Sequence, residues 1–165
     1  MLLYTLNFYF IKLCRKYDVE CSEKWFKHKP QIISKSSSGD VTIYWDQKWY
    51  MSRPVYHCKP GVVVRDSKTN TWTIIDFAVP LDHNIVDKEQ EKITNYGKLV
   101  QVIRSDYSRT RCITKIVLIV VGAFGVVAKN LPSFPKKLGI RDVVGGLQAS
   151  AILRTQRLLK NVLSL

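Results

Sequence analysis

Residues 61–79 read GVVVRDSKTNTWTIIDFAV and contain the two segments that decide the fold. Residues 61–65 and 71–79 are rich in β-branched and aromatic side chains, which favour strands. The polar run 66–70 between them has the composition of a turn of about five residues. This stretch therefore predicts a β-hairpin.

The segments around the hairpin predict further strands and helices. Pro80 ends the second strand, and Asp82 or Asn84 can cap a helix that runs to about residue 105. Strands are expected over 41–45 and 115–121, and helices over 2–17 and 141–163. The apolar run 116–128 is shorter than the roughly 20 residues of a membrane-spanning helix, so it favours a buried strand followed by a turn at Gly122 and Gly125. The order predicts an α/β fold with a mixed sheet flanked by helices.

Length and composition favour one globular domain with a polyanionic partner. The 165 residues include 26 Lys and Arg against 13 Asp and Glu, a net charge of +13, which makes nucleic acid the first candidate partner. We expect an N-terminal helix and basic loop (1–40), a core (41–125) and basic C-terminal helices (126–165), packed as one domain. Four scattered cysteines and no signal-peptide pattern argue against secretion. We expect no membrane partner.

The positive charge is concentrated in the C-terminal third. Residues 104–165 carry eleven basic and two acidic side chains, a net +9, whereas the first 103 residues carry a net +4. Such one-sided charge is typical of a surface that contacts phosphates. The candidate nucleic-acid-binding residues are Lys115, Lys129, Lys136, Lys137, Arg141, Arg154 and Arg157.

Two charged side chains are out of place on the helix predicted after Pro80. At 100° per residue, its apolar positions (Ile85, Ile93, Tyr96, Leu99, Val100 and Ile103) form one arc that faces the sheet. Glu89 and Lys92 fall inside this arc. A charge directed at a core is costly unless it is paired, so both residues must pair with each other or with a polar group on the sheet. Asp76, near the end of an apolar strand, is the obvious partner.

The Asp76 cluster has two interpretations. In the first, Asp76 is a structural carboxylate bonded to Lys92 or to nearby backbone. In the second, Asp76 and Glu89 are catalytic carboxylates that hold a divalent metal, which activates a water for phosphodiester cleavage, and Lys92 positions or deprotonates that water.

Six motifs in order give the chain a resemblance to a known family: KWFKHKP (24–30), YWD (44–46), KPGVVVRD (59–66), IIDFAVPLDHNI (74–85), EKITNYGKL (91–99) and IVVGAFGVVAKNL (119–131). Together they resemble the C-terminal region of non-LTR retrotransposon polyproteins. That region follows the reverse transcriptase and holds a restriction-like endonuclease of the PD-(D/E)xK class. The resemblance implies a restriction-endonuclease-like fold with the order α-β-β-β-α-β plus C-terminal helices, and DNA cleavage with Mg²⁺ or Mn²⁺.

The resemblance also implies roles for individual residues. Asp76 matches the acidic residue on the second hairpin strand, and Lys92 matches the first Lys of the helix pattern EKxxKY, in which Asn95 replaces the second. Gly61 replaces the Asp that would join Asp76 at the metal. Asp66 cannot take the place of that Asp, because it lies five residues beyond position 61, which is about 16 Å along a strand, and an odd offset points its side chain to the other face of the sheet.

We therefore expect a fragment of a retroelement polyprotein, truncated at its N-terminus, whose metal-dependent DNA endonuclease is impaired by Gly61. The alternative from another class is a noncatalytic, basic nucleic-acid-binding remnant with the same fold. DNA is the expected partner, with element RNA as a second candidate, and the expected location is nuclear or nucleocytoplasmic. The target sequence and the oligomeric state are left open.

Overall fold

The computed structural model describes residues 3–21, 31–48, 59–107, 111–129, 131 and 144–163. Within these residues the secondary-structure elements are α1 (Leu3–Lys16), β1 (Ile33–Lys35), β2 (Val41–Trp45), β3 (Val62–Asp66), β4 (Thr71–Ala78), η1 (Asp82–Asn84), α2 (Ile85–Asp106), β5 (Ile113–Val120) and α4 (Val144–Leu163). The mixed α/β class expected from the sequence is confirmed. The short strand β1 was not predicted, because its residues begin a polar, Ser-rich stretch.

The five strands form one sheet in the order β1-β2-β3-β4-β5. The first four strands pair antiparallel, and the predicted hairpin is present as β3 and β4, with Val62 opposite Ile75. β4 and β5 pair in parallel, since α2 carries the chain back along the sheet before β5 begins. The sheet is therefore mixed, as predicted.

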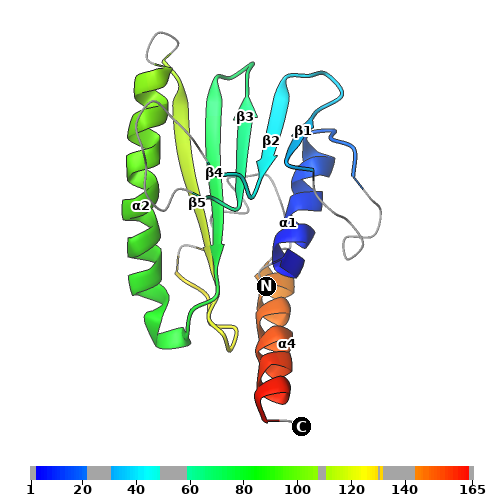
Figure 1. Cartoon of the computed structure of the whole chain (residues 1–165), viewed down its shortest axis with the longest axis vertical. Helices are drawn as coiled ribbons and strands as arrows, with labels where there is room; N and C mark the ends of the chain where they lie inside the picture. The colour runs from blue at the N-terminus through cyan, green and yellow to red at the C-terminus, as the bar shows by residue number, and fades with distance from the viewer. Residues whose placement is uncertain are drawn as a thin grey trace.

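Helices cover both faces of this sheet (Figure 1). Side chains alternate along β4, so Trp72, Ile74 and Ala78 pack in a cluster with α2. Ile75 and Phe77 point the other way and pack with buried residues of α1 and α4. Any β4 residue with an even number thus faces α2, and this parity fixes the surroundings of Asp76.

The buried arc of α2 agrees with the helical periodicity except at one border. Ile85, Tyr96, Leu99 and Ile103 are buried against the sheet, but Ile93 is 44% exposed. Ile93 lies at the edge of the predicted arc, so the buried face of α2 is narrower than the arc predicted from the sequence.

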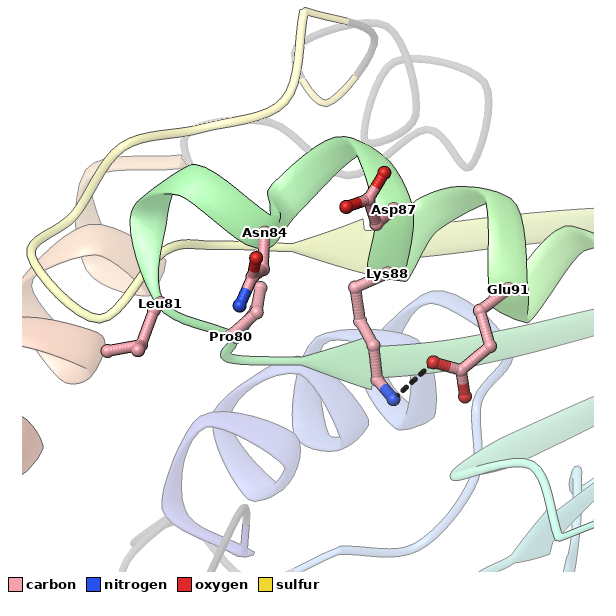
Figure 2. Close-up of a pocket in the computed structure, with 6 residues that line it drawn as sticks. All are labelled: Pro80, Leu81, Asn84, Asp87, Lys88 and Glu91. Carbon is pink, nitrogen blue, oxygen red and sulfur yellow. Dashed lines mark hydrogen bonds and ion pairs between the residues drawn. The ribbon is translucent and has the colours of Figure 1, made fainter.

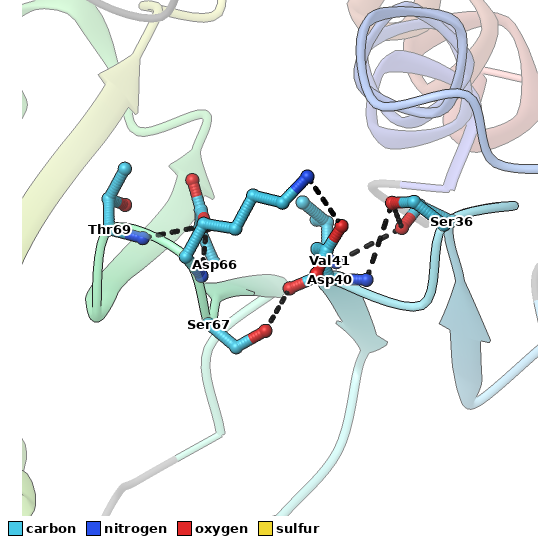
Figure 3. Close-up of polar contacts among 8 residues, drawn as sticks. Ser36, Asp40, Val41, Asp66, Ser67 and Thr69 are labelled. Carbon is cyan, nitrogen blue, oxygen red and sulfur yellow. Dashed lines mark hydrogen bonds and ion pairs between the residues drawn. The ribbon is translucent and has the colours of Figure 1, made fainter.

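Polar contacts join the two turns at one end of the sheet (Figure 3). Asp66 accepts hydrogen bonds from the backbone N–H groups of Lys68 and Thr69, and the Ser67 hydroxyl donates to the Asp40 carbonyl over 2.6 Å. Lys68 forms a 2.8 Å ion pair with Asp40. Asp66 is thus used in its own turn, at the opposite end of β3 from Gly61.

The apolar run 116–128 is a strand followed by a turn, as expected. β5 ends at Val120, and Gly125 adopts a positive φ of 90° in the turn that follows. Two α4 side chains anchor this turn: Gln148 Nε2 donates to the Gly125 carbonyl, and the Thr155 hydroxyl donates to the Ala123 carbonyl. In the part of the chain that the structure describes, no helix is long and apolar enough to cross a membrane.

Candidate functional site

Asp76 is the centre of the candidate site. It lies near the C-terminal end of β4, faces α2 and is only 6% exposed. Of the described residues, it is one of three polar or charged residues that are buried, and the only carboxylate among them. A buried carboxylate is costly unless other groups compensate its charge, so its partners determine what the site can do.

Three donors surround the two Asp76 oxygens. Lys92 Nζ forms an ion pair with Oδ2 at 2.6 Å, and the Tyr96 hydroxyl donates to the same oxygen over 2.7 Å. The backbone N–H of Gly61 donates to Oδ1 over 3.2 Å. The carboxylate therefore has a cation and two neutral donors, which together satisfy both of its oxygens.

Lys92 contacts Asp76, as the helical periodicity predicted. Lys92 is one turn of α2 before Tyr96, near the middle of the buried arc, and its side chain is 23% exposed. Its ammonium lies 5.7 Å from the centroid of the Tyr96 ring, a cation–π distance. The catalytic roles assigned to both residues stay predictions.

Tyr96 is the site residue that the sequence reasoning missed. It was counted as an apolar position of the arc, and its ring is indeed buried with Leu99 and Ile103. Its hydroxyl reaches Asp76 and lies 3.5 Å from the Lys59 carbonyl oxygen. The available signal was chemical, because a buried tyrosine hydroxyl almost always has a hydrogen-bond partner.

Gly61 stands directly across from Asp76. Val62 pairs with Ile75, so the antiparallel register places the preceding residue of β3 opposite the following residue of β4. Gly61 is buried, and it contributes a backbone N–H at the position where the resemblance expects a second carboxylate.

Glu89 does not complete a metal site in this arrangement. It is half-buried on α2, and among the described residues no ion pair or hydrogen bond joins it to Asp76 or Lys92. The described residues contain no group of three or more His, Cys, Asp or Glu side chains that could hold a metal ion. With one buried carboxylate whose oxygens are already bonded to Lys92, Tyr96 and Gly61, the residues present do not fit a divalent cation.

A separate concavity lies beside the first turns of α2 (Figure 2). It has a volume of about 410 Å³ and is lined by Pro80, Leu81, Asn84, Asp87, Lys88 and Glu91. Lys88 and Glu91 form a 2.6 Å ion pair across it. Neither Asp76 nor Lys92 lines this pocket, so it is not an extension of the candidate site.

The predicted phosphate-binding residues do not surround Asp76. Lys115 pairs with Thr73, an odd-numbered position of β4, so it lies on the α1 side of the sheet. There it lies near Lys16, whose pKa is lowered by burial and by this second cation. Arg154 and Arg157 belong to α4, which packs on the same side, and burial lowers the pKa of Arg154.

Four candidate nucleic-acid-binding residues remain. Lys129 is exposed after the turn that follows β5. Lys136, Lys137 and Arg141 lie outside the described residues. The described basic candidates on β5 and α4 thus lie on the opposite side of the sheet from Asp76.

Comparisons with known proteins add no assignment to this geometry. No protein-family model matches the chain, and no curated protein shows significant similarity to it.

Proposed function

We propose that the chain is a DNA-binding domain of restriction-endonuclease-like architecture, from a non-LTR retroelement polyprotein, whose metal-dependent nuclease is impaired. The observation that carries the proposal is the 2.6 Å pairing of Asp76 with Lys92 across from Gly61. An acid on the second hairpin strand and a lysine on the following helix are the two positions that the resemblance assigns to catalysis.

The order of the elements supports the same proposal. If β1 is counted as an addition at the edge, α1, β2, β3, β4, α2 and β5 follow the order α-β-β-β-α-β. The family of the resemblance has this order with a mixed sheet. The chain has 26 basic and 13 acidic residues, and this positive charge supports DNA as the partner, with element RNA as a second candidate. A DNA partner in turn supports a nuclear or nucleocytoplasmic location.

The impairment follows from the chemistry of Gly61. A hydrogen atom replaces the carboxylate that would share a cation with Asp76, and the Gly61 N–H instead donates to Asp76. When bound, Mg²⁺ or Mn²⁺ would supply an activated water, but a single carboxylate already paired with Lys92 gives it too few ligands.

A nicking assay on supercoiled DNA tests the nuclease part of the proposal. We expect no Mg²⁺-dependent nicking by the natural chain and a gain of nicking in Gly61→Asp. Asp76→Ala or Lys92→Ala in the Gly61→Asp background should abolish that gain. Robust nicking by the natural chain would refute the impairment. If Gly61→Asp is inactive, adding Asn95→Lys decides whether the second Lys of the helix pattern was required.

The complete satisfaction of Asp76 favours the alternative that the cluster is purely structural and that the domain only binds nucleic acid. Both the impaired nuclease and the purely structural alternative imply that the domain binds nucleic acid. Binding of a labelled DNA duplex, measured by fluorescence anisotropy at several salt concentrations, tests this shared claim. We expect affinity to fall steeply with salt, since released counterions drive the association. Binding that is absent at low salt, or independent of salt, would contradict both.

A further inference from the structure

The sheet face that carries Asp76 is only partly covered by α2. The hydrophobic cluster under α2 contains residues of β3, β4 and β5, but from β2 it includes only the half-buried Tyr44, and it includes no described residue of β1. Figure 1 shows α2 alongside β5, away from β1 and β2. Ile33, which pairs with Tyr44 and therefore lies on the same face, is 47% exposed. Within the described residues, the hydrophobic clusters place no helix over this half of the face.

A row of side chains crosses this face from one edge of the sheet to the other. Residues that pair directly across neighbouring strands share a face, and the register links Lys35, Thr42, Arg65, Trp72 and Thr114. Trp72 is an even-numbered residue of β4, so the row lies on the same face as Asp76, about 13 Å from it along the strand. Four strand spacings make the row about 19 Å long.

Three cations are spaced along this row. Lys35 is exposed at the β1 end, and Arg65 is half-buried on β3. At the β5 end, Arg104 Nε donates to the Thr114 hydroxyl over 2.8 Å, which holds a third cation over the row. With strands about 4.8 Å apart, the three are spaced at roughly 10 Å. The row therefore presents positive charge at regular intervals, and none of its five paired residues is acidic.

Aromatic rings hold Arg65 in place. Its guanidinium Cζ lies 5.2 Å from the centroid of the Trp72 ring and 5.5 Å from that of Tyr107. In the described part of the chain no carboxylate forms an ion pair with Arg65, and its neighbour Asp66 bonds within its own turn. A guanidinium carries its N–H donors in a planar fork that fits a phosphate group. Arg65 is therefore a positioned cation whose donors suit a phosphate.

Tyr44 adds an aromatic ring beside the cations. It stacks on Trp72 with ring centroids 6.4 Å apart and an interplanar angle of 11°. Trp72 is buried, whereas Tyr44 and Tyr107 are half-buried, so both tyrosines keep part of their surface exposed on this face. Every nucleobase has a flat π-face that can stack on such a ring. Cations interleaved with aromatic rings are typical of surfaces that bind single-stranded nucleic acid.

We propose that this surface, made of Lys35, Tyr44, Arg65, Arg104 and Tyr107 and here called the Arg65 face, binds single-stranded DNA. The inference rests on the DNA partner of the proposed function and assigns the place where that partner binds. The phosphates run across the strands along the three cations, and an unpaired base stacks on Tyr44. A duplex fits this face poorly, because its bases already stack on one another and a flat sheet face cannot enter its grooves.

Fluorescence anisotropy of a labelled oligothymidylate of about 12 nucleotides, titrated with the full chain at several salt concentrations, tests this proposal. Arg65→Met keeps the apolar stem that covers Trp72 and deletes the charge. It should weaken binding and reduce the slope of log K against log salt by about 0.7, the contribution of one phosphate contact on a single strand. Tyr44→Leu should weaken binding roughly ten-fold and leave that slope unchanged, since stacking releases no counterion.

Arg15→Met is the matched control for the loss of charge. Arg15 is exposed in the last turn of α1, which packs on the opposite face of the sheet, so affinity and slope should stay unchanged. If the natural chain binds DNA but Arg65→Met or Tyr44→Leu behaves like this control, the Arg65 face is wrong and the proposed function stands. A natural chain that binds neither single strands nor duplex contradicts both.

Photocrosslinking of the natural chain makes the test independent of how the variants fold. A 5-iododeoxyuridine in place of one thymidine should crosslink to Tyr44 or Tyr107, as mass spectrometry of the linked peptide can show. Crosslinks confined to other parts of the chain would overturn the proposal. An effect of Arg65→Met that is limited to duplex binding would overturn it as well.

Discussion

Among the residues that the structure describes, Lys92 is the one cation that contacts the buried Asp76 carboxylate, and replacing it by Met removes that charge. Lys92 Nζ lies 2.6 Å from Oδ2, and the two side chains are 23% and 8% exposed. Met is close to Lys in length and apolar volume, so the change deletes the charge and keeps most of the packing of the aliphatic stem. The variant isolates the electrostatic contribution of the pair.

The expected cost follows from what Asp76 retains. Tyr96 and the Gly61 N–H still donate to it, but they are neutral groups and cannot replace a full charge. Leaving a buried charge without its partner typically costs 3–5 kcal/mol, and the partial exposure of Lys92 reduces this to about 2–4 kcal/mol. For a chain of this length, the melting temperature should fall by roughly 4–16 °C.

Lys88→Met is the matched control for this experiment. Lys88 is on the same helix, one turn earlier, and also forms a 2.6 Å ion pair, with Glu91. Both of these side chains are more than one-third exposed, so water screens their attraction and the control should cost about 0–0.5 kcal/mol.

Urea denaturation followed by circular dichroism measures both variants against the natural chain. The midpoints should differ with unchanged slope, so that the difference reports the free energy of unfolding. If Lys92→Met and Lys88→Met destabilise the protein equally, the Asp76 pair is not a stabilising contact and the account of the site given above is wrong.

Three further outcomes are expected. Gly122→Ala should destabilise the protein by about 1–3 kcal/mol in thermal unfolding, since its Cβ would collide with the Asp82 carboxylate. Gly97→Ala lies on α2, where its Cβ meets no atom within 4 Å, and should stabilise the protein by about 0.5–1 kcal/mol. Equal effects of the two substitutions would refute this. Burial raises the pKa of the Cys14 thiol to about 12, so it should resist iodoacetamide at pH 8 in the folded protein, as mass spectrometry can show, and rapid labelling would contradict its burial. The hydrogen-bonded ion pair with Lys68 holds the pKa of the half-buried Asp40 below its ordinary value. Any stability lost in Asp40→Asn should therefore be present at pH 7 and vanish as the pH falls through that lowered pKa, and a difference in urea midpoint that does not shrink as the pH is lowered would contradict it.

Local composition and one periodicity in the sequence were sufficient to predict much of the fold. The β-branched and aromatic composition of residues 61–65 and 71–79 and the turn composition of residues 66–70 located β3 and β4, and both strands have the predicted length to within one residue. The 100° period of α2 placed Lys92 on the buried side, where it contacts Asp76. Both features depend on neighbours along the chain, which a single sequence contains.

Features that depend on distant parts of the chain could not be predicted in the same way. β1 has three residues, and its pairing with β2 defines it as a strand more than its own composition does. Basic residues counted along the sequence suggested one surface, but Lys115 lies on the face of the sheet away from Asp76, and only the register of β4 with β5 shows this. Tyr96 was missed because hydrophobic patterning treats its ring and its hydroxyl as one apolar residue.

Gly61 and the three donors around Asp76 are best understood as one coupled arrangement. A buried carboxylate requires a compensating charge. Among the described residues Lys92 alone supplies it, while Tyr96 and the Gly61 N–H complete the hydrogen bonds. An aspartate at position 61 would place two negative charges opposite one lysine. Such a pair favours either protonation or a bound cation. Gly61→Asp should therefore be less stable than the natural chain without divalent cations and regain stability when Mg²⁺ is added, whereas the natural chain should show no such shift. A Mg²⁺-dependent rise in the melting temperature of the natural chain would show that Asp76 already binds a cation, and no rise in Gly61→Asp would separate position 61 from the metal site altogether.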